Sequence, residues 1–276
     1  MVVFPNSKIN LGLNVVQKRG DGFHDIETVF YPIQLNDALE IIKKPDSNLG
    51  HSFSTSGLQI PGDPGNNICL KAYSLLKKEF PQLGSVGIYL HKAIPMGAGL
   101  GGGSSDGAAA LATLNKLFNL GLSKEQLIER AAFLGSDCPF FIINEPCFAR
   151  GRGEILERIA IHLLPYKLII VNPDIHVATA EVFSTINPVL PSKSIKQIVR
   201  QPIETWKNEL TNDFEESVFK KYPDIKSIKD ELYRLGAFYC AMTGSGSTVF
   251  GIFDKDSNVE PSFPSTYFVK TIQTRY

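Results

Sequence analysis

A glycine-rich segment at residues 95–106, PMGAGLGGGSSD, carries the clearest chemical signal in the sequence. Glycines let the backbone approach a ligand closely, so that several N–H groups can converge on one anion. The segment leads directly into an amphipathic helix predicted over 107–119, whose amino terminus favours negative charge, and Ser104 and Ser105 add hydroxyl donors. The pattern predicts a phosphate-binding loop rather than a flexible hinge, because a hinge would not lead into a well-formed helix.

Two familiar types of phosphate loop fit this segment poorly. A P-loop needs a lysine directly before its Ser or Thr, and Gly103 precedes Ser104 here. Gly97, Gly99 and Gly102 do satisfy the GxGxxG spacing of dinucleotide-binding folds. That loop normally follows the first strand of a domain, whereas this one begins at residue 95. A dinucleotide-dependent oxidoreductase therefore stays open only as a distant alternative.

Two ionisable side chains, Lys8 and Asp137, are candidates for proton transfer or charge stabilisation. The segment KINLGLNVV at 8–16 alternates between apolar and polar residues, which predicts a half-buried strand with Lys8 and Asn10 on one face. Asp137 lies in the turn GSDCPFF at 135–141. A carboxylate in a turn can accept a proton or cap the turn, and a single lysine is most often solvated. The residues alone therefore leave catalytic and structural roles open for both.

The composition is that of a globular protein without a charge bias. The chain has 276 residues, of which 43% are hydrophobic and 20% are charged. Lys and Arg number 28, and Asp and Glu also number 28, so the formal net charge is zero. A protein that binds duplex nucleic acid usually carries a basic excess. We therefore expect no nucleic-acid partner.

Cysteine and histidine patterns give no sign of a disulfide framework or a zinc site. The four cysteines form no CxxC pair, and the five histidines form no HxH or HExxH pattern. The first ten residues lack the features of a signal peptide, and the apolar run at 163–171 is too short to span a bilayer. We expect reduced thiols, a cytoplasmic location and no membrane partner.

The hydrophobic patterns predict both strands and helices along the chain. Further strands are expected at 27–33, 38–44, 86–94, 167–173, 237–242 and 247–253. Further helices are expected at 66–80, 123–134, 179–186, 194–200, 203–210, 213–220 and 224–235. Ser123 and Gln126 form a capping-box pattern, and a loop is expected at about 45–65. The pattern of predicted elements changes near 150–165, after which several short helices follow. The sequence therefore predicts an α+β chain with two lobes.

Several motifs resemble those of one kinase superfamily. PMGAGLGGGSSDGAAAL resembles the second motif of the GHMP kinases, which include galacto-, homoserine, mevalonate and phosphomevalonate kinases, and MTGSGSTVFG at 242–251 resembles their third motif. Three other segments resemble a narrower branch, the 4-diphosphocytidyl-2-C-methyl-D-erythritol kinases of the non-mevalonate isoprenoid pathway. They are KINLGLNVVQKRGDGFHDIETVF at 8–30, GSDCPFF, and ARGRGE at 149–154. The matches follow one another in the correct order.

This resemblance implies a fold and a reaction. The fold would be the two-lobed GHMP kinase fold, with an N-terminal ATP-binding and catalytic lobe at 1–157 and a C-terminal, ferredoxin-like, substrate-binding lobe at 158–276. The reaction would be the ATP-dependent phosphorylation of the 2-hydroxyl of 4-diphosphocytidyl-2-C-methyl-D-erythritol. Mg²⁺ is expected because the charge of a triphosphate needs bridging. A monomer or a weak homodimer is expected.

The resemblance also implies roles for single residues. Asp137 would take the proton of the acceptor hydroxyl, and Lys8 would orient Asp137 and stabilise developing charge. ATP would be bound by Asn67, Lys92, Pro95, Met96, Gly97, Ala98, Gly99, Leu100, Gly101, Gly102, Gly103, Ser104 and Ser105. The acceptor would be bound by Asn10, Phe23, His24, Thr179, Phe183, Gly244 and Ser245. Ser105 would be the protein ligand of Mg²⁺, with water supplying most of the shell.

The chain departs from the branch at three positions. Phe23 stands where the branch usually has Tyr, Gly107 where it usually has Ala, and Ala180 where some members have Pro. Phe23 keeps the ring that would stack on cytosine, and Phe183 would supply the second face of the sandwich. These rings favour a base-bearing acceptor over that of a homoserine or mevalonate kinase, which is the first alternative. A regulatory binder without catalysis is a further one, although Lys8 and Asp137 are both present.

Overall fold

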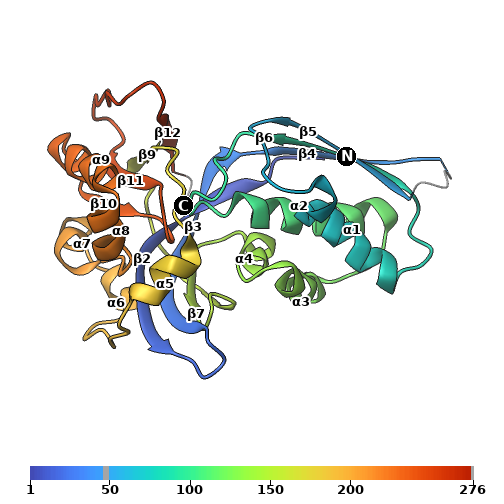
Figure 1. Cartoon of the computed structure of the whole chain (residues 1–276), viewed down its shortest axis with the longest axis horizontal. Coiled ribbons are helices and arrows are strands. Elements are labelled where there is room, and N and C mark those ends of the chain that lie inside the picture. Colours follow the sequence, from blue (N-terminus) through green and yellow to red (C-terminus); the bar gives the residue numbers. More distant parts are fainter. Residues whose placement is uncertain (46–49, 275–276) are drawn as a thin grey trace. The chain divides into compact units, whose positions relative to one another are not determined.

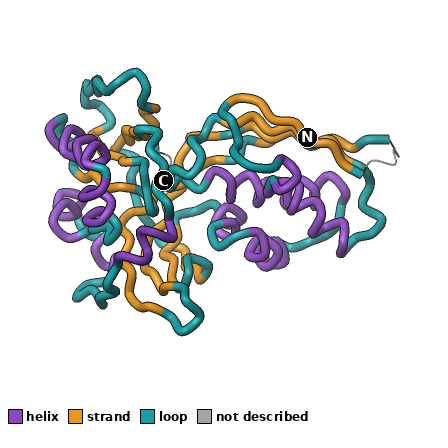
Figure 2. Tube along the Cα trace, viewed as in Figure 1, coloured by secondary structure: helices purple, strands orange, loops and turns teal. Residues whose placement is uncertain are grey.

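The structure is a computed structural model that describes residues 1–45 and 50–274. The chain forms two compact units (Figures 1 and 2). Unit 1 comprises Met1–Ser7, Leu35–Met96 and Gly101–Glu145, and unit 2 comprises Lys8–Gln34, Gly97–Leu100 and Pro146–Tyr276. The α+β class is confirmed. The units are not contiguous in sequence, unlike the expected lobes at 1–157 and 158–276. The early strand His24–Asn36 pairs with the later strand Cys147–Arg150, and Asn6–Lys18 lies beside it in the same sheet.

Unit 1 contains a four-stranded sheet with the order β1-β4-β6-β5. Its strands are β1 (Val2–Val3), β4 (Ala38–Lys43), β5 (His51–Gly57) and β6 (Val86–Lys92). β5 runs parallel to β6, and the other pairs are antiparallel. β5 lies within the loop expected at 45–65, whose residues 46–49 fall outside the described ranges. That expectation was wrong for 51–57, because an edge strand with mostly exposed polar residues leaves little periodic signal.

Helices pack on one face of this sheet (Figure 1). They are α1 (Ile68–Glu79), α2 (Gly102–Phe118), α3 (Lys124–Leu134) and α4 (Cys138–Ile143), with a short 3₁₀ turn at Pro64–Asn66. Leu76, Leu90 and Leu111 lie in the core between sheet and helices. The capping box of Ser123 and Gln126 at the start of α3 is confirmed. α4 was not expected, since six residues are too few for a helical repeat to show.

α2 begins at Gly102 rather than at 107, so Gly107 lies inside the helix. A Cβ added at Gly107 would come within 2.7 Å of Cγ1 and 2.9 Å of Cδ1 of Ile68. Gly107 therefore lets α1 pack closely on α2. This contact gives a physical reason for the departure from the alanine that is usual in the branch.

Gly107→Ala is expected to destabilise the protein by about 1–3 kcal/mol, the usual cost of overpacking. Helix propensity alone predicts the opposite, a gain of about 1 kcal/mol. Denaturant unfolding of Gly107→Ala, Ile68→Ala and the double variant decides between them. We expect the double variant to lose less than the sum of the two single losses, because Ile68→Ala removes the clashing atoms. A stabilised Gly107→Ala protein would show that the helices can move apart freely.

Unit 2 contains two four-stranded sheets, ordered β2-β3-β7-β8 and β10-β11-β9-β12. Their strands are β2 (Asn6–Lys18), β3 (His24–Asn36), β7 (Cys147–Arg150), β8 (Ile155–Arg158), β9 (Tyr166–Asn172), β10 (Tyr239–Met242), β11 (Val249–Asp254) and β12 (Phe268–Gln273). The second sheet is antiparallel throughout. β7, β8 and β12 were not expected, because strands of four to six residues are too short to show a clear alternation.

Five helices accompany these sheets, close to the expected positions. They are α5 (Thr179–Thr185), α6 (Ile195–Ile198), α7 (Ile203–Glu209), α8 (Glu215–Lys221) and α9 (Pro223–Arg234). Ile225, Ile228 and Leu232 form the buried face of α9 and pack in one core with strand residues such as Ile169 and Val249. No helix in the described part of the chain is long and apolar enough to cross a membrane.

Candidate active site

The first half of the glycine-rich segment packs on the loop between β10 and β11, within unit 2. A Cβ at Gly99 would lie 2.0 Å from the carbonyl oxygen of Thr243, and Gly99 has a φ of +77°. The N–H of Thr248 donates to the carbonyl of Ala98 at 3.3 Å. A Cβ at Gly244 would lie 3.3 Å from Cα of Gly99. The second and third motifs therefore meet backbone to backbone, which only glycine permits at these positions.

Lys8 and Asn10 form a buried polar pair on β2. Nζ of Lys8 donates to Oδ1 of Asn10 at 2.6 Å, and the side chains are 4% and 1% exposed. The Lys8 ammonium also lies 4.8 Å from the ring centre of Phe30. The shared face is confirmed, but the half-buried strand is not. β2 is buried on both faces from Asn6 to Val15, because later segments of the chain cover the polar face as well.

Two threonine hydroxyls hold Asn10 in place. Nδ2 of Asn10 donates to Oγ1 of Thr28 at 2.9 Å, and that hydroxyl donates to the carbonyl of Gly12 at 2.6 Å. Oγ1 of Thr243 accepts from the N–H of Asn10 and lies 3.1 Å from the carbonyl of Gly99. Asn10 therefore links Lys8 to the place where the glycine-rich segment packs on the loop between β10 and β11. The network fixes the direction of the Lys8 ammonium.

The second half of the glycine-rich segment belongs to unit 1 and opens α2. Gly101 has a φ of +71° and stands at the N-cap position without a side-chain cap. A Cβ at Gly102 would come within 2.9 Å of the Ile94 side chain, whereas a Cβ at Gly103 would meet nothing within 4 Å. No side chain therefore caps the first N–H groups of α2, and the space next to Gly103 is open. This geometry suits an anion at the helix terminus.

The side chain of Lys92 does not face open solvent, although the sequence placed it in the nucleotide pocket. It is 1% exposed, and its ammonium pairs with Asp37 and with Oδ2 of Asp106, the latter at 2.8 Å. Burial lowers the pKa of Lys92, but Asp106 and Asp37 more than reverse this, so the pKa lies above its usual value. Burial raises the pKa of Asp106 to about 7, against the effect of Lys92. Lys92 therefore anchors structure rather than presenting its charge to a ligand.

Asp137 precedes α4 directly and belongs to unit 1. It occupies the N-cap position, yet its side chain makes no capping hydrogen bond to that helix. Asp137 therefore does not cap α4 through its side chain, and its catalytic role stays a prediction. Lys8 belongs to unit 2, so the pairing of Lys8 with Asp137 stays a prediction.

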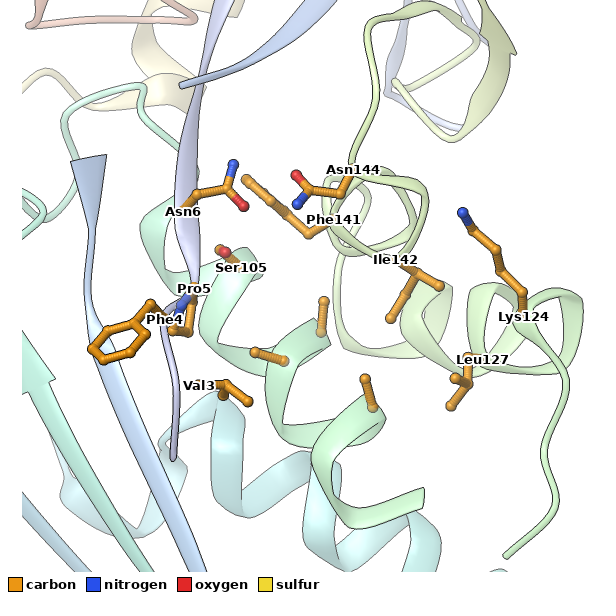
Figure 3. A pocket seen from close by; sticks show the side chains of 13 residues that line it. Val3, Phe4, Pro5, Asn6, Ser105, Lys124, Leu127, Phe141, Ile142 and Asn144 are labelled. Atoms are coloured by element: carbon orange, nitrogen blue, oxygen red, sulfur yellow. The ribbon is translucent and has the colours of Figure 1, made fainter. Parts of the chain in front are cut away.

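Ser105 lines a cavity of about 380 Å³ in unit 1. Figure 3 shows Ser105 together with Asn6, Phe141 and Asn144 among the residues that line it. Ser105 is 3% exposed. Across residues 1–45 and 50–274, no group of three or more His, Cys, Asp or Glu side chains could hold a metal ion. A single hydroxyl fits a Mg²⁺ that takes its other ligands from phosphate and water.

Two other predicted nucleotide contacts, Asn67 and Met96, also belong to unit 1. Oδ1 of Asn67 accepts the N–H of Cys69 at 2.9 Å and so caps α1. Met96 is an exposed apolar residue. Asn67 thus has a structural role that the sequence pattern did not indicate, and Met96 is not a core residue.

The residues predicted to bind the acceptor lie in unit 2 and are partly assembled. Phe23 is 50% exposed, with the guanidinium carbon of Arg152 4.1 Å from its ring centre, so it is not a core residue. The His24 ring stacks on Phe183 with centroids 5.1 Å apart. The hydroxyls of Thr179 and Ser245 lie 2.8 Å apart. The structure therefore brings His24 to Phe183, while a sandwich of Phe23 and Phe183 stays a prediction.

Three charged residues have contacts in the structure that no sequence motif indicated. Asp37 sits between two strands without any motif, and Arg152 lies within ARGRGE with no assigned role. Asp106 directly follows the two serines of the glycine-rich segment. This position was the one available sign that Asp106 pairs with a cation. A carboxylate next to an anion site repels the anion unless a cation neutralises the carboxylate.

The chain is similar to known proteins over most of its length. The family model described as GHMP kinases N terminal domain matches residues 67–145, and that described as GHMP kinases C terminal matches residues 194–261. A Bacteroides fragilis protein named 4-diphosphocytidyl-2-C-methyl-D-erythritol kinase is 54% identical over 259 residues, 94% of each chain. A Cytophaga hutchinsonii protein of the same name is 51% identical over 255 residues, 92% of this chain and 93% of its own.

A solved structure agrees over the whole length. The crystal structure of a 4-(cytidine 5'-diphospho)-2C-methyl-D-erythritol kinase superposes with a TM-score of 0.79 at 29% identity and covers 100% of both chains. The expected GHMP kinase fold is therefore confirmed. The chain belongs to the GHMP kinases and, within them, to the family of the 4-diphosphocytidyl-2-C-methyl-D-erythritol kinases.

Proposed function

We propose that this protein transfers the γ-phosphoryl group of ATP to the 2-hydroxyl of 4-diphosphocytidyl-2-C-methyl-D-erythritol. Its relatives in two organisms carry the name of that kinase at 54% and 51% identity. The single observation that carries the proposal is the buried pair of Lys8 and Asn10, tied through Thr243 to Gly99 of the glycine-rich segment. A lysine held in this way beside a phosphate loop serves charge stabilisation rather than solubility.

The chemistry would need little beyond positioning and charge neutralisation. The oxygen of the acceptor hydroxyl attacks the γ-phosphorus, and ADP leaves. The carboxylate of Asp137 takes the proton of that hydroxyl during the attack. The ammonium of Lys8, oriented by Asn10, stabilises negative charge on the transferred group. The N–H groups of the glycine-rich segment and the start of α2 bind the ATP phosphates. Bound Mg²⁺, with Ser105 as its proposed protein ligand, would supply bridging charge on the triphosphate.

Aromatic residues of unit 2 would select the acceptor. Phe23 and Phe183 offer ring faces to a cytosine, and His24 offers ring and backbone groups to its edge. For a base to stack on the face of Phe183 that His24 now covers, the His24 ring must turn aside. We also propose a cytoplasmic enzyme, monomeric or weakly dimeric, without nucleic-acid or membrane partners.

Phe23→Ala is expected to raise the KM for the cytidyl acceptor about 5- to 150-fold. Base–aromatic stacking contributes roughly 1–3 kcal/mol per base, and each 1.4 kcal/mol is about tenfold in affinity. The KM for ATP should stay near its original value. Steady-state kinetics with each substrate varied in turn measures both constants.

Phe23→Tyr is the matched control and should be nearly neutral, because tyrosine keeps the ring. The thermal midpoint of Phe23→Ala should change little, since the ring is half exposed. Unchanged acceptor affinity in a folded Phe23→Ala protein would rule out the stacking role and favour an acceptor without a base.

Another GHMP kinase activity, on homoserine or mevalonate, is the alternative. ATP turnover by the purified protein with each of the three acceptors separates them. We expect turnover with the cytidyl acceptor and none above background with the other two. Chelation of Mg²⁺ by EDTA should abolish the turnover, and added Mg²⁺ should restore it. Turnover with homoserine or mevalonate alone would overturn the assignment.

A further inference from the structure

A buried cluster of one ammonium and two carboxylates lies in unit 1, outside the set of groups that would contact substrates. Its members are Lys92, Asp37 and Asp106, which are 1%, 1% and 2% exposed. Lys92 donates to Oδ2 of Asp37 and to Oδ2 of Asp106. Ionised groups are almost never buried to this extent unless they pair with one another. The fold therefore holds these three side chains in one fixed arrangement.

The cluster fastens the start of the glycine-rich segment. Asp37 lies between β3 and β4, and its second oxygen, Oδ1, accepts the N–H groups of Ala93 at 2.6 Å and Ile94 at 2.9 Å. These two residues directly precede Pro95, where the segment begins. Asp37 thereby fixes the point at which the chain leaves β6, whose last residue is Lys92.

The same cluster fastens the end of the segment. Asp106 lies on α2, within five residues of its start at Gly102. A Cβ at Gly102 would be 3.3 Å from Nζ of Lys92, so the ammonium lies against the first residue of the helix. Both ends of the glycine-rich segment are thus attached to one ammonium group. The span between them would present its N–H groups to phosphate.

Stability alone explains the cluster poorly. A buried ion pair often contributes no more than well-packed apolar side chains of the same volume. Oδ1 of Asp106 is moreover buried without a hydrogen-bond partner among the described residues, which costs stability. An arrangement that gains little stability but fixes two chain segments in register is better explained by the geometry that it imposes.

We infer that Asp37, Lys92 and Asp106 are positioning residues that hold both ends of the glycine-rich segment in the shape that binds the phosphates of ATP. This inference rests on the proposed function. None of the three contacts the nucleotide with its side chain. They act through the backbone of Ala93, Ile94 and Gly102, whose placement sets the direction of the N–H groups between them.

Kinetics of paired Asp106 variants test this. Asp106→Ala removes the attachment of α2 to Lys92 and is expected to raise the KM for ATP about tenfold or more, since small misplacements of binding groups cost up to about 10²-fold. Asp106→Asn keeps an oxygen that accepts from Lys92 and should restore most of the affinity. The KM for the acceptor should stay unchanged in both. If Asp106→Ala and the original protein have the same KM for ATP, the inference is overturned.

A second variant covers the case in which Asp106→Ala does not fold. Asp37→Asn, Lys92→Met and Asp106→Leu together leave no unpaired buried charge, so this triple variant should fold. Its KM for ATP should rise about tenfold or more, because α2 is no longer attached to Lys92. A folded triple variant with the original KM for ATP would contradict the inference.

Leu76→Ala is the matched control for general damage to unit 1. Leu76 is fully buried in α1 and belongs to the core of this unit. That core includes no residue of the glycine-rich segment. It should lower the thermal midpoint and leave both KM values unchanged. The proposed function fails separately: if Gly101→Val also leaves ATP binding intact, the segment does not bind ATP at all.

Discussion

Replacing Asp137 by asparagine is expected to lower kcat by about 10²-fold or more. The substitution keeps the size of the side chain but removes the group that accepts the proton of the acceptor hydroxyl, and one acid–base group typically contributes about 10²- to 10⁴-fold. ATP affinity should change little, because the nucleotide is bound by the glycine-rich segment. Rapid-quench measurement of ADP formation and calorimetric titration with ATP provide the two quantities.

Asp137→Ser separates catalysis from capping. Serine is a good N-cap residue but a poor proton acceptor, so a capping role would leave Asp137→Ser active. We expect it to be as impaired as Asp137→Asn, since the Asp137 side chain makes no capping hydrogen bond. Substantial activity of Asp137→Ser, with a normal thermal midpoint, would remove Asp137 from the mechanism.

Gly101→Val is expected to abolish measurable ATP binding. Gly101 has a φ of +71°, a conformation that a β-branched residue adopts only with strain of the order of 1–3 kcal/mol. The valine would either shift the loop or place its side chain beside the N–H groups at the start of α2. Both outcomes displace the donors that bind phosphate. Calorimetric titration with ATP measures the loss.

Gly121→Val is the matched control for this prediction. Gly121 has a φ of +74° and open space around it, and it also belongs to unit 1. The backbone strain is therefore similar, so both variants should lose similar stability in thermal unfolding. Gly121→Val should bind ATP normally. Equal ATP affinity in the two folded variants would mean that the glycine-rich segment is structural only.

The long periodic elements of the fold could be predicted from the sequence, and the short ones could not. α1, α3 and α9 lie close to their predicted ranges because their apolar residues recur at helical spacing over three turns. α4 and β7 have six and four residues, too few for any repeat, and their burial comes from tertiary packing. The start of α2 at Gly102 was missed because glycine has a low helix propensity, which packing overrides here.

The motifs predicted the backbone conformation of the glycine-rich segment, but they did not indicate roles that depend on burial. Glycines at 97, 99 and 101 do adopt positive φ, as a loop that binds through its backbone requires. Lys92 shows the limit: its sequence neighbourhood indicates a nucleotide contact, but its partner Asp37 is 55 residues away in sequence. Nothing local in the sequence indicates that these two charges meet inside a core.

Identification of the reaction product shows directly whether this protein phosphorylates the 2-hydroxyl of the cytidyl acceptor. The purified protein, ATP, Mg²⁺ and 4-diphosphocytidyl-2-C-methyl-D-erythritol are incubated, and the product is examined by ³¹P and ¹³C NMR. We predict one new phosphate monoester, coupled to the carbon that bears the 2-hydroxyl, with the cytidine diphosphate group intact and one ADP formed per product. A phosphate on another hydroxyl, or ADP formed without any phosphorylated acceptor, would rule out the proposed reaction.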